Sequence, residues 1–484
     1  MTLVYNNGKI DKEKLYNKKF KEVFKMTTKC RTYVDVLTQH TEVTGSTLLL
    51  IIRLSSGKIV KGLIDCGAFQ EPNYQAENSK LIIDPKQLDF VCITHAHMDH
   101  AGRIPLLVNK GYEKKIFCTN GTAEFLPYAL HDNLKIMRDK SRRNNEKVLY
   151  FAEDVNKTMQ LIEKKEYDET FSVHPKVKIT FLENGHLLGA SLILIQIEDE
   201  ENVNLLFTGD YNNKNVFFNV KSIPQWVKDL PLTIVTESTY GDKTTQECLE
   251  ENGGNNFDYN IIEASKENKS ILIPAFALER TQEILYRIRC IQEQGYLKDY
   301  SVYLDGSLAI IYTELLKLGR IKNLKVQDFL PGNFSYIVNS VMRSEIINSR
   351  SNKIIVTTSG MGQYGPAQIY IPEFIVKQNS LIQFTGYCAQ GTYGRKLQEE
   401  SVYSNTVKFT AEFSAHAKKD VLLSLISQFS DIKAVLINHG NNEAKLKFKE
   451  YLEKEISKNS YILNKKIGYR VNAYGIMKEL NTIF

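Results

Sequence analysis

Cysteine is scarce along this chain and shows no paired spacing. Its seven cysteines are scattered over 484 residues, and no C-x-x-C occurs. Cys66, Cys92 and Cys118 lie inside or beside apolar runs, which is typical of buried free thiols. This distribution excludes a disulfide-built scaffold and predicts a protein of the reducing cytoplasm.

Long apolar stretches are missing as well. The first thirty residues are rich in lysine and lack the apolar core of a secretory signal peptide. The aliphatic run Leu48–Ile52 is followed by Arg53 and is far too short to cross a bilayer. We therefore expect no membrane partner.

Neither sign of charge dominates the composition. Lysine and arginine number 62 against 56 acidic residues, so the net charge is +6, which is compatible with a polyanionic partner but only weakly favours one. With 43% hydrophobic and 24% charged residues, the chain has the composition of an ordinary globular protein. Its length predicts two or three domains.

The order of expected elements divides the chain. The first half predicts strands at 48–54, 59–65, 90–94, 115–119, 177–182, 191–197 and 204–208, with helices at 122–140 and 153–165. A solvated turn is expected at 141–147. From about 232 strands and helices alternate, which is typical of a parallel sheet with crossover helices. Beyond residue 405 the element pattern of the first half returns, with an expected strand at 406–413. One α/β domain is therefore predicted to interrupt another.

Histidine is rare but concentrated at one place. Of nine histidines, three fall within six residues, at His95, His97 and His100, and Asp99 lies among them. The cluster follows the apolar run 90–93, so it is expected on the loop at the end of a buried strand. Imidazole and carboxylate are the ligands that zinc takes in hydrolytic sites, so the pattern predicts a metal site.

Four further polar residues end expected strands beside glycine. They are Asp65, His186, Asp210 and His439. Taken singly, each is more often part of an ordinary turn or a satisfied core residue than a site residue. At successive strand ends after the histidine cluster, they strengthen the prediction of one shared site.

This series of residues resembles the motifs of metallo-β-lactamase-fold hydrolases. Glu237 and His416 resemble further motifs of the β-CASP branch, which comprises nucleic-acid-processing nucleases. Supporting matches are Ile273-Pro274-Ala275-Phe276-Ala277-Leu278-Glu279-Arg280, Thr358-Ser359-Gly360-Met361, Phe384-Thr385-Gly386-Tyr387 and Gly391-Thr392-Tyr393-Gly394-Arg395. The resemblance runs from about residue 32 to the end. It is closest to prokaryotic RNases of this family and to the core of the eukaryotic pre-mRNA 3′-end processing endonuclease.

The resemblance implies an α/β fold: a metallo-β-lactamase αββα sandwich interrupted by a β-CASP parallel-sheet domain. The expected division is an N-terminal extension at 1–29, the first part of the metallo-β-lactamase domain at 30–230, the β-CASP domain at 231–400 and the second part at 401–484.

Two zinc ions are implied as cofactors. His95, His97 and His186 would hold one, Asp99, His100 and His439 the other, with Asp210 bridging. Asp65 would orient the ligand loop by hydrogen bonds. The resemblance implies that Asp65 and Asp99 also belong to the catalytic residues.

The resemblance also implies the reaction. His416, oriented by Glu237, would protonate the leaving 3′-oxygen while water attacks, giving a 5′-phosphate and a 3′-hydroxyl. Single-stranded RNA is the expected substrate. Ser359 and Gly360 are candidate phosphate contacts. Arg280 and Arg395 are candidates too, with a solvated or salt-bridged role as the open alternative.

Three other functions stay open at this point. A DNA nuclease of the same fold fits less well because the RNA branch carries histidine at the position of His439. A non-catalytic RNA-processing subunit would have lost ligands, and none is lost here. A small-molecule hydrolase would have no room for the insert between Glu237 and His416. The sequence decides neither endonuclease against 5′-exonuclease action nor whether the chain forms a homodimer.

Overall fold

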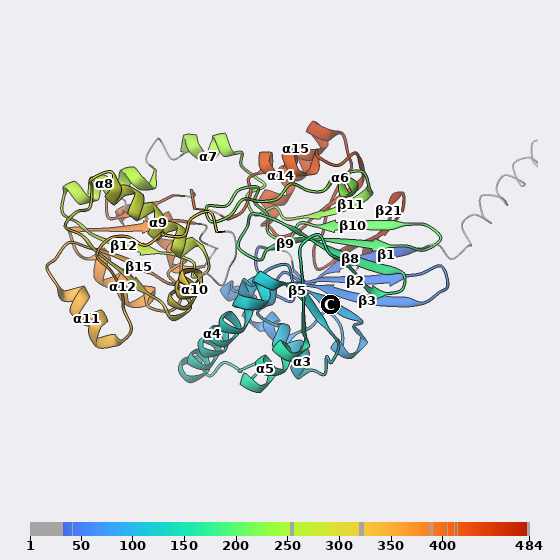
Figure 1. The fold of residues 1–484 in the computed structure, drawn as a ribbon, viewed down its shortest axis with the longest axis horizontal. Helices are drawn as coiled ribbons and strands as arrows, with labels where there is room; N and C mark the ends of the chain where they lie inside the picture. Colours follow the sequence, from blue (N-terminus) through green and yellow to red (C-terminus); the bar gives the residue numbers. More distant parts are fainter. Residues whose placement is uncertain are drawn as a thin grey trace, which may run out of the picture.

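The molecule is built from two sheets packed face to face and a third sheet beside them (Figure 1). The computed structural model describes residues 32–40, 42–251, 256–318, 324–386, 388, 391–403, 405–410, 412–413 and 415–481. The expected N-terminal extension, and Tyr387 among the supporting motifs, lie outside the described residues.

The first sheet of the sandwich has eight strands in the order β21-β20-β1-β2-β3-β4-β5-β6. Helices α3 (Ile104–Asn109), α4 (Asn120–Asn144) and α5 (Ala152–Leu161) cover its outer face. The strands are β1 (Tyr33–Thr38), β2 (Leu48–Arg53), β3 (Ile59–Ile64), β4 (Phe90–Cys92), β5 (Ile116–Thr119), β6 (Ile162–Lys165), β20 (Ile467–Asn472) and β21 (Gly475–Asn481).

The second sheet has seven strands in the order β19-β18-β11-β10-β9-β8-β7. Helices α6 (Gln225–Lys228), α14 (Lys419–Ile426) and α15 (Asn442–Ile456) cover its outer face. The strands are β7 (Thr170–His174), β8 (Val177–Glu183), β9 (Ser191–Ile197), β10 (Val203–Phe207), β11 (Pro231–Thr236), β18 (Asp431–Ile437) and β19 (Ser460–Ile462).

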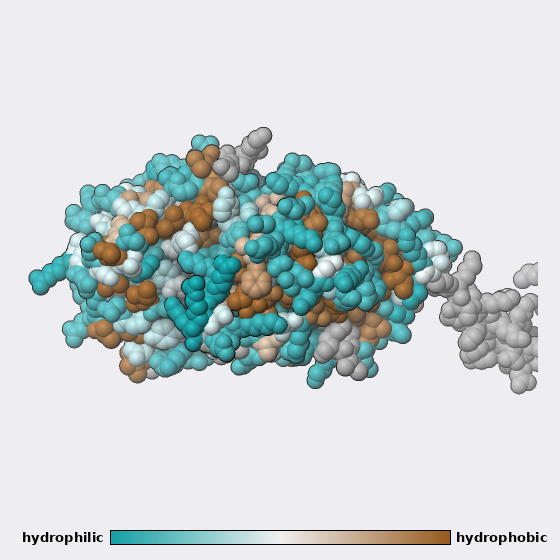
Figure 2. All heavy atoms as spheres, turned by 90° about the horizontal axis from the view of Figure 1, so that it is seen from below, coloured by the Kyte–Doolittle hydropathy of each residue, from teal (hydrophilic) through white to brown (hydrophobic). Residues whose placement is uncertain are grey.

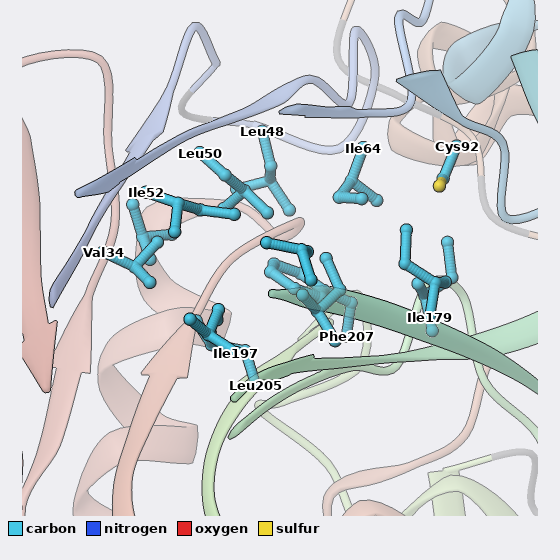
Figure 3. Packing of buried hydrophobic residues seen from close by; sticks show 14 of the residues in the cluster. Val34, Leu48, Leu50, Ile52, Ile64, Cys92, Ile179, Ile197, Leu205 and Phe207 are labelled. Carbon is cyan, nitrogen blue, oxygen red and sulfur yellow. The ribbon is translucent and has the colours of Figure 1, made fainter. Parts of the chain in front are cut away.

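The core of the sandwich is made of aliphatic and aromatic side chains. Leu48, Leu50 and Ile52 project from the first sheet toward Leu205 and Phe207 of the second, and all five are buried (Figure 3). Burying such side chains stabilises the fold by about 1.5–3 kcal/mol each. Helices outside two packed sheets complete the αββα arrangement.

The third sheet forms the inserted domain, at the left of Figure 1, and all its strands run parallel. Its order is β14-β13-β15-β12-β16-β17. These strands are β12 (Ser270–Pro274), β13 (Ser301–Asp305), β14 (Phe334–Tyr336), β15 (Lys353–Thr357), β16 (Ser380–Phe384) and β17 (Val407–Phe409). Its helices are α8 (Phe257–Lys266), α9 (Arg280–Glu293), α10 (Ser307–Lys317), α11 (Ser340–Asn348), α12 (Ala367–Ile375) and α13 (Tyr393–Glu399).

Sheet membership places the ends of the insertion later than predicted. Strand β11 lies in the sandwich, parallel to β10 and β18, although the expected boundary stood at residue 230. Strand β17 pairs with β16 of the inserted sheet, beyond the expected boundary at 400. The chain then returns to the sandwich with α14 and β18. The four-part division stays a prediction in its exact boundaries.

Several expected elements differ in extent. The helix expected at 153–165 ends at Leu161, because Ile162–Lys165 pairs with β5 as an edge strand. Helix α4 continues to Asn144 where a turn was expected, and Asn145 ends it with a left-handed φ of 56°. The strand expected at 406–413 covers only Val407–Phe409.

The cysteines match the sequence prediction where the structure describes them. Cys66, Cys92 and Cys118 are buried and free. Among the helices of the described residues, none has both the length and the apolarity that a membrane span needs.

Candidate metal centre

The candidate site lies where five strands of the two sheets end. Asp65 follows β3, the His95–His100 segment follows β4, Asp210 follows β10, Glu237 follows β11 and His439 follows β18. These carboxyl ends meet at one edge of the sandwich, so residues far apart in sequence come together. The short helix α2 (Met98–Ala101) carries Asp99 and His100 into this edge.

The ligand loop is held by close backbone contacts that require glycine. Cys66 N–H donates to the His100 carbonyl at 2.8 Å, and Ala68 N–H donates to the Met98 carbonyl at 2.7 Å. A Cβ atom on Gly67 would lie 1.5 Å from the Asp99 carbonyl oxygen. Only glycine therefore allows the segment after β3 to run this close to α2.

A first group of ligand atoms is compact. His97 Nδ1 lies 3.1 Å from both His95 Nε2 and His186 Nε2. Asp210 Oδ2 lies 3.5 Å from His95 Nε2 and 3.6 Å from His186 Nε2. Zinc bonds of about 2.0–2.1 Å give tetrahedral edges of about 3.3–3.4 Å, so this group has the size of a zinc site.

A second group shares the same aspartate. His100 Nε2 lies 3.1 Å from both His439 Nε2 and Asp210 Oδ1. Asp99 Oδ2 completes the group at 3.9 Å from His100 Nε2 and 3.8 Å from His439 Nε2. The two oxygens of Asp210 therefore face one group each, which is the arrangement of a bridging carboxylate.

The chemistry of these atoms fits metal ions. Both carboxylate oxygens of Asp210 are buried without a hydrogen-bond partner in the structure. Burying an ionised carboxylate without hydrogen bonds is costly, whereas coordination would satisfy both oxygens. Burial lowers the pKa of His95 and His186 well below the usual value and that of His97 to about 4. These imidazoles are therefore neutral at pH 7, the form that binds metal.

Asp65 orients His100 through the ring nitrogen that does not face the other ligand atoms. Its Oδ2 lies 2.7 Å from His100 Nδ1, which leaves His100 Nε2 facing the ligand atoms. Thr94 holds Asp65 in turn, through its backbone N–H at 2.7 Å and its hydroxyl at 2.8 Å. Burial alone would lower the pKa of His100, but the carboxylates of Asp210 and Asp65 outweigh it and raise that pKa. Thr94 was not among the predicted site residues, although it directly precedes His95.

Glu237 and His416 form a separate pair beside the ligands. Glu237 Oε2 lies 2.8 Å from His416 Nδ1, and its Oε1 accepts from the Tyr211 backbone N–H at 2.5 Å. His416 Nε2 lies 3.8 Å from Asp210 Oδ2. Burial alone would lower the pKa of His416, but the carboxylates of Glu237 and Asp210 overcome it and raise the pKa to about 9.

The four expected substrate contacts lie in the inserted domain, and three of them, Ser359, Arg280 and Arg395, already have partners. Ser359 Oγ accepts from the backbone N–H groups of Gln363 and Tyr364 at 3.2 and 3.1 Å. Arg280 pairs with Glu283, and Arg395 Nε donates to Glu399 at 2.8 Å. The salt-bridged alternative is thus what the structure shows for both arginines. Ser359 and Gly360 follow β15 at the carboxyl edge of a parallel sheet, where ligands commonly bind. Substrate contact by any of the four stays a prediction.

Comparison with known families matches three successive parts of the chain. Residues 46–239 match the metallo-beta-lactamase superfamily, residues 281–397 the Beta-Casp domain, and residues 405–463 the Zn-dependent metallo-hydrolase RNA specificity domain.

Individual proteins are similar over most of the chain. A protein named ribonuclease TTHA0252 from Thermus thermophilus is 30% identical over 430 residues, 83% of this chain and 91% of that protein. An RNase J-like protein from Methanocaldococcus jannaschii is 29% identical over 401 residues, 80% of this chain and 88% of that protein. A transcription termination factor FttA from Methanosarcina mazei is 28% identical over 386 residues, 74% of this chain, but the match spans only 59% of that protein.

A solved structure shares the fold. The crystal structure of a protein of unknown function from Enterococcus faecalis V583 superposes with a TM-score of 0.52 at 12% identity, covering 91% of this chain and 100% of that one. The fold and the motifs agree with the three family matches and with the relative that is 30% identical. The chain belongs to the β-CASP family of metallo-β-lactamase-fold nucleases and is a metal-dependent hydrolase.

Proposed function

We propose that this protein is a two-zinc ribonuclease that hydrolyses RNA phosphodiester bonds to leave a 5′-phosphate and a 3′-hydroxyl. One observation carries the proposal: two compact groups of ligand atoms share Asp210, and a Glu237–His416 pair lies beside them. Paired metal sites of this kind are typical of enzymes that cleave phosphate esters.

The ligand set supports zinc in particular. Five imidazoles and two carboxylates supply the two groups, and the edges near 3.1–3.6 Å of the first group fit zinc bonds. Zinc ions held there would lower the pKa of water and neutralise charge on the phosphate oxygens. The residues that would hold them are His95, His97, His186, Asp210, Asp99, His100 and His439.

His416 is proposed as the proton donor to the leaving 3′-oxygen. Its Nδ1 is committed to Glu237 at 2.8 Å, so its Nε2 is the nitrogen that points into the site. The raised pKa of about 9 keeps the ring protonated at neutral pH, as a general acid must be. Glu237 is itself fixed by the Tyr211 backbone N–H, so the pair has a defined direction.

RNA is favoured as the substrate by the similar proteins. Two of them are named as RNases, and the family matched at 405–463 is described as an RNA specificity domain. We propose that an RNA strand passes between the sandwich and the inserted domain, near Ser359 and Gly360. Cytoplasmic localisation and a homodimer stay predictions.

The test is cleavage of matched nucleic acids by zinc-loaded protein. A 5′-labelled linear RNA, the same RNA as a closed circle and single-stranded DNA of the same sequence are incubated with wild type and with His416→Ala. The proposal expects RNA products that carry a 5′-phosphate, and little cutting by the variant. Cutting of DNA alone would assign the DNA-nuclease alternative, and no cutting at all would favour the non-catalytic one. Cleavage of the circle establishes endonuclease action.

A further inference from the structure

Glu279 is a carboxylate buried at the interface between the sandwich and the β-CASP domain. Its exposed fraction is 1%, and it directly precedes α9 with a left-handed φ of 64°. Glu279 Oε2 accepts from the Leu188 backbone N–H at 2.7 Å and from the Tyr312 hydroxyl at 3.2 Å, and Oε1 accepts from the Asn215 amide. Leu188 and Asn215 belong to the sandwich, so this β-CASP side chain reaches across the interface.

Leu188 and Tyr312, which both bind Glu279, belong to a buried apolar cluster formed by the two domains. The rings of Phe125 and Tyr312 lie 4.5 Å apart, and those of Phe217 and Phe329 lie 5.6 Å apart, each pair joining the two domains. Burial raises the pKa of Glu279, while Arg280 counteracts this from 3.6 Å. A buried carboxylate is stable in such a place only when its oxygens are hydrogen-bonded, as they are here. Other buried members of the cluster are Ala96, Phe218, Leu278, Leu315 and Leu316.

Leu188 lies on the loop between β8 and β9 that carries His186. From the sandwich side, Asn184 Oδ1 accepts from the His186 backbone N–H at 2.9 Å, and Asn184 Nδ2 donates to the Asp210 carbonyl at 3.0 Å. The other end of the loop, at Leu188, is fixed by Glu279. The loop on either side of His186 is therefore held by Asn184 of the sandwich and by Glu279 of the β-CASP domain.

Asn215 ties the same carboxylate to the start of the loop. Its amide nitrogen donates to the Gly185 carbonyl at 3.1 Å as well as to Glu279. Asn215 Oδ1 accepts from the Phe217 backbone N–H at 2.8 Å, which fixes the orientation of the amide. Both ends of the loop, Gly185 and Leu188, therefore connect to Glu279.

We infer that Glu279 is a positioning residue of the metal centre: from the β-CASP domain, it fixes the loop that places His186 among the ligands. The inference rests on the proposed two-zinc function. Because His186 belongs only to the first group of ligands, losing Glu279 should weaken one zinc and spare the other. Docking of the β-CASP domain and assembly of the first zinc site are thereby coupled.

The test compares zinc affinity in wild type, Glu279→Gln, Ser307→Ala and His186→Ala. Glu279→Gln keeps the size of the side chain but removes its charge and one acceptor. Ser307→Ala is the control, because Ser307 Oγ donates to Asp132 at 3.2 Å across the same interface without touching the His186 loop. Zinc is titrated into apo-protein against a fluorescent chelator, and His186→Ala identifies which equivalent belongs to the first group. Circular dichroism confirms folding.

Glu279→Gln is expected to hold one zinc as wild type does and the other roughly tenfold or more weakly, within the 10–100-fold typical for residues that orient ligands. Ser307→Ala should leave both unchanged. Unchanged affinities in Glu279→Gln, or equal weakening of both zinc ions, overturn the inference. A single zinc in wild type contradicts the two-zinc proposal instead. The inference is then decided by whether Glu279→Gln weakens the zinc that His186→Ala removes. Glu279→Ala, if folded, should show the larger effect.

Discussion

Replacing Glu237 by glutamine should move the alkaline limit of cleavage to lower pH. Glu237 Oε2 lies 2.8 Å from His416 Nδ1, and its charge is the largest influence that raises the pKa of this imidazole against burial. Glutamine keeps the size and an oxygen acceptor but removes the charge. The proton on His416 then loses its main stabilising partner.

The magnitude follows from the two opposing influences. The pKa of His416 is about 9 with Glu237 ionised, against 6.5 for an unperturbed histidine, and burial alone would lower it further. Removing the charge should therefore lower the pKa from about 9 toward 6.5, while Asp210 continues to raise it, and each pH unit of that change corresponds to about 1.4 kcal/mol of lost stabilisation of the imidazolium. Bound zinc ions would lower the pKa in both proteins, so the difference between them is the quantity to measure.

The proposed role of His416 determines the direction in which activity changes with pH. A general acid acts only while protonated, so activity is present below its pKa and is lost as the pH rises through it. Single-turnover cleavage of labelled RNA is measured over pH 5–10 for wild type and Glu237→Gln. Glu247→Gln is the control, because Glu247 pairs with Lys419 and not with His416. An alkaline limit that stays in place in Glu237→Gln would refute the proton-donor role.

Three further variants separate metal binding from proton transfer. His416→Ala should keep its zinc but lose cleavage by roughly 10²–10⁴-fold. The double variant with Glu237→Gln should be little worse, because the two residues act as one unit. Elemental analysis measures the zinc and single-turnover kinetics the cleavage; if His416→Ala loses zinc, His416 is a ligand. His97→Ala should lose zinc and activity together, since it removes a nitrogen 3.1 Å from those of His95 and His186; retained zinc would contradict its assignment. Gly67→Ala should also lose zinc, because its Cβ would lie 1.5 Å from the Asp99 carbonyl and displace α2; normal zinc content would show that the loop can shift freely.

The ligands could be predicted because they follow strands that the apolar pattern reveals. His95, His97 and Asp99 come after the buried run 90–93, and Asp210 and His439 come after strands that end in buried apolar residues. Strand ends converge at a sheet edge, so the pattern carried spatial information. The pairing of ligands into two groups came from the family resemblance, and the geometry is consistent with it.

Contacts that depend on packing between domains could not be predicted. Glu279 lies in a motif that the sequence highlighted, yet its partners Leu188 and Asn215 are more than sixty positions away along the chain. Arg280 is a local case, because an arginine three residues before Glu283 at the start of a helix fits both a salt bridge and a substrate contact, and the sequence left both open. The edge strand β6 was mistaken for helix since its burial is set by pairing with β5.

The central claim is a two-zinc centre bridged by Asp210. Zinc-edge anomalous diffraction from crystals of protein purified without chelator tests it most directly. Two zinc peaks about 3.5–4 Å apart are expected, with Asp210 Oδ2 facing one and Oδ1 the other. A single peak, or two peaks that Asp210 does not bridge, would contradict the account.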